Sequence, residues 1–157
     1  MDKDFLLDSE PARRLYHEYA EGMPILDYHS HISVKEIREN KKFASITEAW
    51  LGGDHYKWRL MRAMGVDEAF VSDPAASDWE RFEKWAEVIP YTVGNPVYQW
   101  THLELKRFFG IEEQLSPATA REIFDKCNEF LRSEAGTVRS LIKNSGVKAI
   151  CSTDDPT

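Results

Sequence analysis

Two short apolar segments near the ends of the chain constrain the fold more than any other feature. They lie near residues 24–31 and 147–153, and each is bounded by glycine, proline or polar residues, which is typical of a buried strand. Between them, from about residue 33 to 145, apolar residues recur at helical spacing. The pattern predicts a strand, a large and mainly helical insertion, and a second strand, so we expect an α/β fold that is mostly α in content.

Capping signals place several of the helices, and a helix ending at Ser145-Gly146 is expected to lead into the second strand. Helix starts are predicted at Ser9 ahead of Pro11 with a helix to about Ala20, at Ser33 three residues before Glu36, at Ser77 three residues before Glu80, at Pro96, and at Ser116-Pro117. No repeat, low-complexity tract or linker-like run interrupts the 157 residues, so we expect no domain boundary inside the chain.

Composition excludes several classes of protein. With 42% hydrophobic and 30% charged residues the chain can bury a core, and its net charge of -7 disfavours nucleic acid and anionic membranes as partners. Neither a secretory signal nor an apolar run of about 18 residues is visible. The two cysteines are far apart and outside any CxxC pattern, and we expect Cys151 to be a buried small hydrophobic residue. We therefore expect a soluble, cytoplasmic protein.

His29 and His31 end the first strand-like segment. Residues two apart on a strand point to the same face, so both imidazoles can reach one ion. Neutral imidazole is a common ligand for zinc, the metal we favour, and for related divalent metals such as manganese. Asp27 lies on the same face and could support the ligands. The spacing alone is weak evidence, and structural histidines in a non-catalytic helical interaction module remain an alternative.

The segment from Asp54 to Arg62 is dense in groups that transfer protons or hold anions. His55 and Tyr56 are candidate acids or bases, and Arg59 or Arg62 could hold a carboxylate. The alternative is a surface helix that begins at an Asp54 cap, with Tyr56 and Trp58 half-buried.

Other polar residues are not assigned a role in catalysis. His17 and His102 lie inside expected helices, where a lone histidine is usually structural. Asp154 and Asp155 follow the second strand, where a turn is at least as good an explanation as a site.

Five blocks together resemble the uronate isomerase (glucuronate isomerase) family, in colinear order across essentially the whole chain. They are Asp4 to Asp8, Ile25 to His31, Gly53 to Arg59, Gly94 to Leu105, and Thr153 to Pro156.

The resemblance implies the start of a distorted (β/α)8 TIM-like barrel of the amidohydrolase superfamily, with a helical insertion after strand 1. It implies interconversion of D-glucuronate with D-fructuronate and of D-galacturonate with D-tagaturonate, through an enediol. By position, His29 and His31 resemble metal ligands, His55 and Tyr56 resemble residues that contact the substrate, and Tyr56 is the favoured acid or base. Family members tend to form oligomers, so the resemblance is compatible with a homo-oligomer.

A complete barrel needs roughly 250 residues, so the resemblance predicts a truncated chain whose 157 residues alone have negligible activity. A hydrolase that uses the two histidines to activate water is the rival enzyme class.

Overall fold

The structure, a computed structural model, describes residues 2–73 and 75–153. The chain divides into two compact units, one formed by Met1–Asn40 with Val138–Thr157 and the other by Lys41–Thr137. We call these the strand unit and the helical unit. The expectation of no internal boundary was wrong, because the helices between the two strands carry enough apolar faces to form a core of their own.

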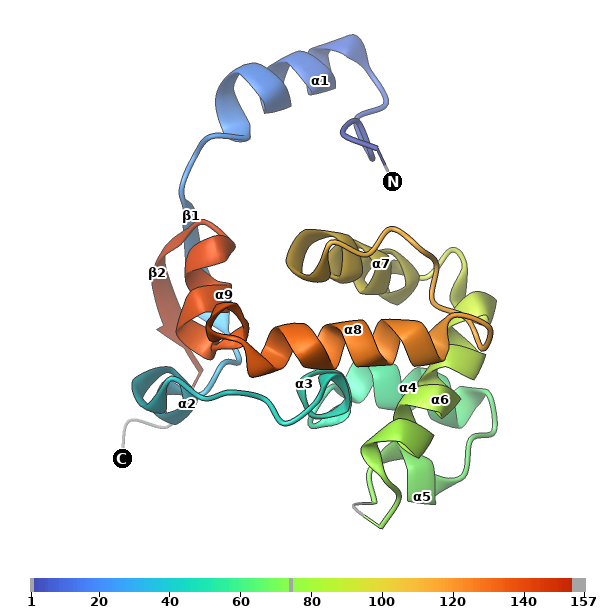
Figure 1. The fold of residues 1–157 in the computed structure, drawn as a ribbon. Helices are drawn as coiled ribbons and strands as arrows, with labels where there is room; N and C mark the ends of the chain where they lie inside the picture. Colours follow the sequence, from blue (N-terminus) through green and yellow to red (C-terminus); the bar gives the residue numbers. More distant parts are fainter. Residues whose placement is uncertain (1, 74, 154–157) are drawn as a thin grey trace. The chain divides into compact units, whose positions relative to one another are not determined.

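The strand unit contains a two-stranded sheet in which β1 (Ile25–Ser30) and β2 (Val147–Ser152) run parallel. The register pairs Leu26 with Ala149 and Ser30 with Ser152. Helix α9 (Val138–Asn144) precedes β2 and lies beside it (Figure 1), and α2 (Val34–Glu39) packs on α9. Gly146, with a φ of 76°, makes the turn between α9 and β2. A parallel pair joined through a distant helical connection is what the sequence pattern predicts.

Both strands are more exposed than the sequence suggested. Tyr28 on β1 is 87% exposed, and Leu26 and Cys151 are exposed as well. Parallel sheets are normally covered on both faces, and two short helices cannot cover both faces of this one. The expectation that Cys151 is buried was therefore wrong for this chain.

The first helix changes geometry partway along. It begins at Ser9, whose hydroxyl accepts the Ala12 amide, and runs as α1 (Glu10–Leu15) before widening into a π-helical turn, η1 (Tyr16–Ala20). The predicted end near Ala20 is correct, and the large apolar residues Leu15 and Tyr19 of this helix are exposed to solvent.

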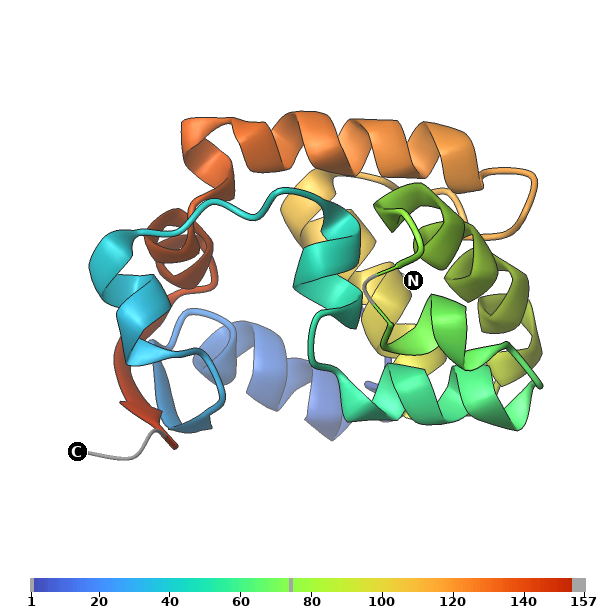
Figure 2. The same ribbon diagram turned by 90° about the horizontal axis from the view of Figure 1, so that it is seen from below.

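The helical unit is built from six α-helices and two 3₁₀ turns among its described residues. They are α3 (Ile46–Leu51), α4 (His55–Ala63), α5 (Glu68–Val71), α6 (Asp78–Val88), η2 (Ile89–Thr92), α7 (Pro96–Phe109), α8 (Ala120–Arg132) and η3 (Glu134–Gly136). Seen from below, α8 and α4 lie on opposite sides of the unit (Figure 2), and α6 packs against both.

An aromatic cluster fills the core of the helical unit. Phe82 on α6 is fully buried, and its ring lies 6.1 Å from Trp50, 6.5 Å from Trp79 and 5.2 Å from Phe124, between ring centroids. These residues come from α3, α6 and α8, so one cluster joins three helices. Burial of such large apolar side chains is the main force that holds helices together.

The predicted helix starts agree with the structure at four helices and differ at a fifth. Ser9 and Ser33 are the N-caps of α1 and α2. Ser77 and Glu80 form the reciprocal capping box of α6, and α7 begins at Pro96 as expected. Helix α8 begins at Ala120 and not directly after Ser116-Pro117. The predicted start was wrong because Ser116 to Thr119 form a turn, in which the Thr119 hydroxyl accepts the Ser116 amide at 3.0 Å.

No helix among the residues that the structure describes is long and apolar enough to cross a membrane.

Candidate functional site

His29 and His31 converge at the carboxyl end of β1. Their Nε2 atoms lie 3.2 Å apart, their ring centroids are 5.0 Å apart, and the rings stand at 73° to each other. Both side chains are exposed to solvent. The pair therefore has the same-face arrangement that the two-residue spacing predicts.

The separation of the two Nε2 atoms suits two ligands of one ion. Nitrogen atoms bound tetrahedrally at the usual zinc–nitrogen distance lie about 3.3 Å apart. The same 3.2 Å also suits a direct hydrogen bond, in which one protonated Nε2 donates to the other. The geometry is thus compatible with shared coordination without requiring it.

Two further polar groups lie beside the histidine pair. Thr153 Oγ1 is 3.5 Å from Nδ1 of His31, the nitrogen on the side of the ring away from His29. Asp27 Oδ1 accepts the backbone amide of His29 at 3.3 Å, so this carboxylate supports the strand end. Among residues 2–73 and 75–153, no group of three or more histidine, cysteine or acidic side chains could hold a metal. Two imidazoles are therefore what the described chain offers to an ion.

The amino end of α4 carries the second set of candidate residues. Asp54 caps this helix, because its Oδ1 accepts the amides of Tyr56 at 2.9 Å and Lys57 at 3.1 Å. Two glycines, Gly52 and Gly53, lead into the cap. The first peptide groups of α4 are therefore fixed by a carboxylate at the positive end of the helix.

His55 and Tyr56 differ in how their side chains are held. The His55 ring stacks on Trp58, with centroids 5.2 Å apart and planes at 23°. The Trp58 indole donates to the Leu51 carbonyl at 2.9 Å, and Arg81 donates to the same oxygen at 2.9 Å. Tyr56 is 64% exposed. The His55 imidazole is therefore held by stacking on the Trp58 ring, while the Tyr56 phenol is exposed to solvent.

Arg59 lies on the same side of α4 as these two residues, since it follows His55 by four positions and Tyr56 by three. It is exposed. Phenol, imidazole and guanidinium therefore share one helical face, which can combine proton transfer with recognition of an anion. The alternative interpretation was partly correct, since Asp54 is the cap and Trp58 is half-buried, but Tyr56 is mostly exposed.

The two sets of residues belong to different units. The structure brings His29 and His31 together in the strand unit, and it places His55, Tyr56 and Arg59 on one helix of the helical unit. Asp154 and Asp155 lie outside the described residues.

The other two histidines, His102 and His17, form hydrogen bonds within the chain. His102 Nδ1 donates to the Tyr98 carbonyl at 2.7 Å, which leaves Nε2 to accept the Leu115 amide at 3.0 Å. Burial lowers the pKa of His102, in keeping with a neutral ring that ties α7 to the loop after it. His17 bridges Asp4 at 2.8 Å and Glu21 at 3.0 Å.

Sequence reasoning missed Lys57, which is 6% exposed although Tyr56 beside it in α4 is 64% exposed. Its Nζ donates to Asp54 Oδ2 at 2.7 Å. An aspartate cap followed three residues later by lysine is the one signal in the sequence that could have indicated this pair.

Comparison with known proteins agrees with this architecture. The family model described as glucuronate isomerase matches residues 1–157. The uronate isomerases of Bacteroides fragilis and Bacillus velezensis are 55% and 57% identical over 156 residues, 99% of this chain and 33% of each relative. The chain thus spans about a third of the length of these curated relatives.

Solved structures give the same result. The crystal structure of uronate isomerase from Thermotoga maritima aligns with a TM-score of 0.92 at 38% identity, covering 99% of this chain and 34% of that one. Glucuronate isomerase from Caulobacter crescentus aligns with a TM-score of 0.88 at 25% identity, covering 98% and 34%. On this evidence, the chain belongs to the glucuronate isomerase family.

Proposed function

We propose that the natural protein carrying this chain is a cytoplasmic aldose–ketose isomerase of uronic acids. It interconverts D-glucuronate with D-fructuronate and D-galacturonate with D-tagaturonate. The observation that carries this proposal is the identity of 55% to curated uronate isomerases across 99% of the chain. No competing enzyme class has comparable support.

In this proposal β1 and β2 are the first two strands of a distorted (β/α)8 barrel of the amidohydrolase superfamily, and the helical unit is the insertion after strand 1. The parallel pairing of the strands supports this. So do the apolar side chains that β1 exposes, since parallel barrel strands are covered on both faces by further strands and helices.

His29 and His31 are the proposed ligands of a divalent metal, with zinc favoured over manganese. Support comes from their converging Nε2 atoms at the carboxyl end of a strand, where barrel enzymes place their active sites. When bound, such an ion supplies Lewis-acid polarisation of the oxygens on the sugar carbons that react.

The helix α4 supplies the groups proposed to act on the substrate. Isomerisation removes the proton from C2 of the aldose and returns a proton to C1, with an enediol between the two steps. Tyr56 is the proposed acid or base, because its phenol is exposed and carried on a fixed helix end. His55 positions the sugar hydroxyls, and Arg59, on the same helical face, pairs with the carboxylate of the uronate.

An assay of the full natural chain tests the proposal. With D-glucuronate or D-galacturonate, we expect the ketose product, and Tyr56→Phe should reduce kcat by about 100-fold or more if the phenol transfers the proton. Absence of isomerisation together with cleavage of esters or amides would favour a hydrolase. Absence of both would favour an interaction module. Size-exclusion chromatography of the same protein tests the homo-oligomer that the resemblance implies.

A further inference from the structure

Lys57 holds an unusual position for a lysine. Its side chain is only 7% exposed and runs back toward the amino end of α4, where Nζ donates to Asp54 Oδ2 at 2.7 Å. The same carboxylate accepts the Tyr56 and Lys57 amides through its other oxygen. One carboxylate therefore connects the buried ammonium to the peptide group that carries Tyr56.

The ammonium is surrounded by two more groups of the helical unit. It lies 5.7 Å from the centroid of the Trp50 ring, within the range of a cation–π interaction. Glu104, half-buried on α7, interacts with Lys57, Asp54 and the Trp50 indole. Burial raises the pKa of Glu104, the Lys57 charge lowers it, the Asp54 charge raises it and the Trp50 hydrogen bond lowers it. Lys57 is thus paired with the Asp54 carboxylate, and its charge also acts on Glu104 from a different helix.

Isolated buried charges are costly, and a lysine is seldom buried without a reason. A capping carboxylate alone would fix the helix end, because an aspartate accepts the first amides without help from a lysine. The additional ammonium places the cap within cation–π range of Trp50 on α3, and Trp50 in turn is hydrogen-bonded to Glu104 on α7, whose charge interacts with that of Lys57. The amino end of α4 is thereby connected to the core and not only to its own first turn.

We propose that Lys57 is a positioning residue, which holds the end of α4 so that His55 and Tyr56 are presented in a fixed orientation to the substrate. The proposal rests on the isomerase function proposed above. Lys57 itself is turned away from solvent and acts through Asp54 and the peptide of Tyr56. A small shift of a reacting group is enough to cost about 100-fold in rate, so a residue that fixes the helix end affects the reaction without touching the substrate.

The test compares Lys57→Met with a double variant, Lys57→Met/Glu104→Gln, in the full natural chain. The single variant removes the cation that acts on both Asp54 and Glu104, so it can fail through the repulsion between these two carboxylates alone. The double variant removes that repulsion, while Asp54 keeps its backbone cap. We expect the double variant to fold like the wild type, yet to lose about 10- to 100-fold in kcat with a KM changed by less than about threefold.

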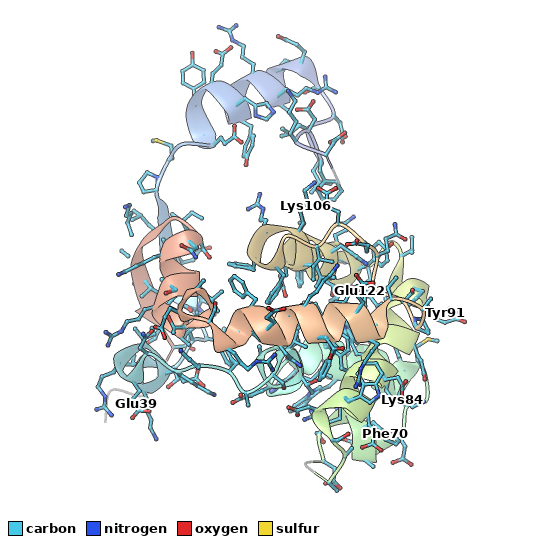
Figure 3. All side chains as sticks on the ribbon, in the orientation of Figure 1. Glu39, Phe70, Lys84, Tyr91, Lys106 and Glu122 are labelled. Atoms are coloured by element: carbon cyan, nitrogen blue, oxygen red, sulfur yellow. The ribbon has the colours of Figure 1, made fainter. Side chains whose placement is uncertain are left out.

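Lys84→Met is the matched control. Lys84 donates to Glu87 three residues away at 2.9 Å, and its Nζ lies 6.0 Å from the centroid of the Phe70 ring. Lys84 and Phe70 are labelled in Figure 3. It therefore has the same kind of carboxylate and aromatic neighbours as Lys57, but it belongs to α6 and is proposed to hold no reacting group. Its kcat should stay within about twofold of the wild type.

Amide hydrogen exchange supplies a readout that does not depend on activity. In the double variant, the amides of Tyr56 and Lys57 should exchange about fivefold faster or more, while the amides of α6 should be unchanged. A double variant with wild-type kcat and wild-type exchange at Tyr56 would overturn the positioning role and leave Lys57 as a charge-balancing residue. A wild-type protein that does not isomerise uronates would overturn the proposed function instead, and the exchange at Tyr56 would still decide whether Lys57 holds the helix end.

Discussion

The Nε2 atoms of His29 and His31 approach to 3.2 Å although no packed core holds the two rings. His29 lies on β1 and His31 one residue past its end, where extended backbone directs side chains two residues apart to the same face. Partial ordering of the two rings by the strand lowers the entropy lost when both bind one ion. We therefore expect the full natural chain to bind about one zinc ion.

Replacing both histidines with alanine should weaken zinc affinity by more than about 100-fold, because loss of supporting residues alone costs 10- to 100-fold. Isothermal titration with zinc, checked by elemental analysis of the dialysed protein, measures the effect. His17→Gln is the control, since His17 bonds to Asp4 and Glu21 and is not a proposed ligand. Unchanged stoichiometry and affinity in the double alanine variant would show that the metal is held elsewhere.

The order of strand, helices and strand could be predicted from the sequence because its signals are local. Short apolar runs and their bounding residues place β1 and β2, and caps such as Ser77 with Glu80 place helix starts. The predicted start of α8 was wrong because Ser116-Pro117 is compatible with both a turn and a helix. The hydrogen bonds of Thr119 stabilise the turn. The partners of Thr119 lie three and five residues away, so two local structures compete here, and the Ser-Pro signal alone does not decide between them.

The site could be predicted from the sequence only where its geometry depends on residues close together in the chain. The convergence of His29 and His31 follows from the two-residue period of a strand, so spacing was sufficient. The burial of Lys57 depends on Trp50 in α3 and Glu104 in α7, which lie outside its own helix, so the spacing of Asp54 and Lys57 could indicate the ion pair but not the burial. The exposure of Cys151 likewise depends on what covers β2, and an apolar segment alone does not provide that information.

The aromatic core should dominate the stability of the helical unit. Phe82 is fully buried among Trp50, Trp79 and Phe124, so Phe82→Ala should lower the free energy of unfolding by about 3–5 kcal/mol. All five tryptophans lie between residues 41 and 137, so intrinsic fluorescence during urea unfolding reports on this unit.

Tyr91→Ala is the matched control for that substitution. Tyr91 follows α6 in the same unit, but it is 75% exposed and points away from the helices (Figure 3). Its loss should change the free energy of unfolding by less than about 0.5 kcal/mol. Equal effects of the two substitutions would show that the cluster around Phe82 does not hold the unit together.

His17 should make the amino-terminal segment sensitive to pH. Its hydrogen bonds to Glu21 and then to Asp4 raise the pKa of His17 above its ordinary value of 6.5, and the same contact lowers the pKa of Asp4. A histidine whose pKa is raised on folding stabilises the fold fully below its unfolded pKa, and this stabilisation is lost as the pH rises through the folded pKa.

Between pH 6 and pH 8.5, amide exchange in the segment from Asp4 to Ala20 should therefore accelerate beyond the intrinsic base-catalysed increase. His17→Gln, which is neutral throughout, should remove that additional acceleration. An NMR titration of the His17 ring gives its pKa directly, and a value at or below 6.5 would contradict the expected stabilisation.

The two cysteines should react very differently with iodoacetamide in the 157-residue chain. Cys151 on β2 is exposed, whereas Cys127 on α8 is buried in the core of the helical unit, and this burial raises its pKa to about 12. Because the thiolate is the nucleophile, a buried thiol of such high pKa reacts only when the unit opens. Mass spectrometry after mild alkylation at pH 8 should find Cys151 modified and Cys127 intact, with Cys127 becoming modified in urea.

In the full natural chain, the barrel proposed above would cover β2. Protection of Cys151 in that chain, compared with its reactivity in the 157-residue chain, would support burial of this strand. Equal reactivity of Cys151 in both proteins would contradict a barrel built on β1 and β2.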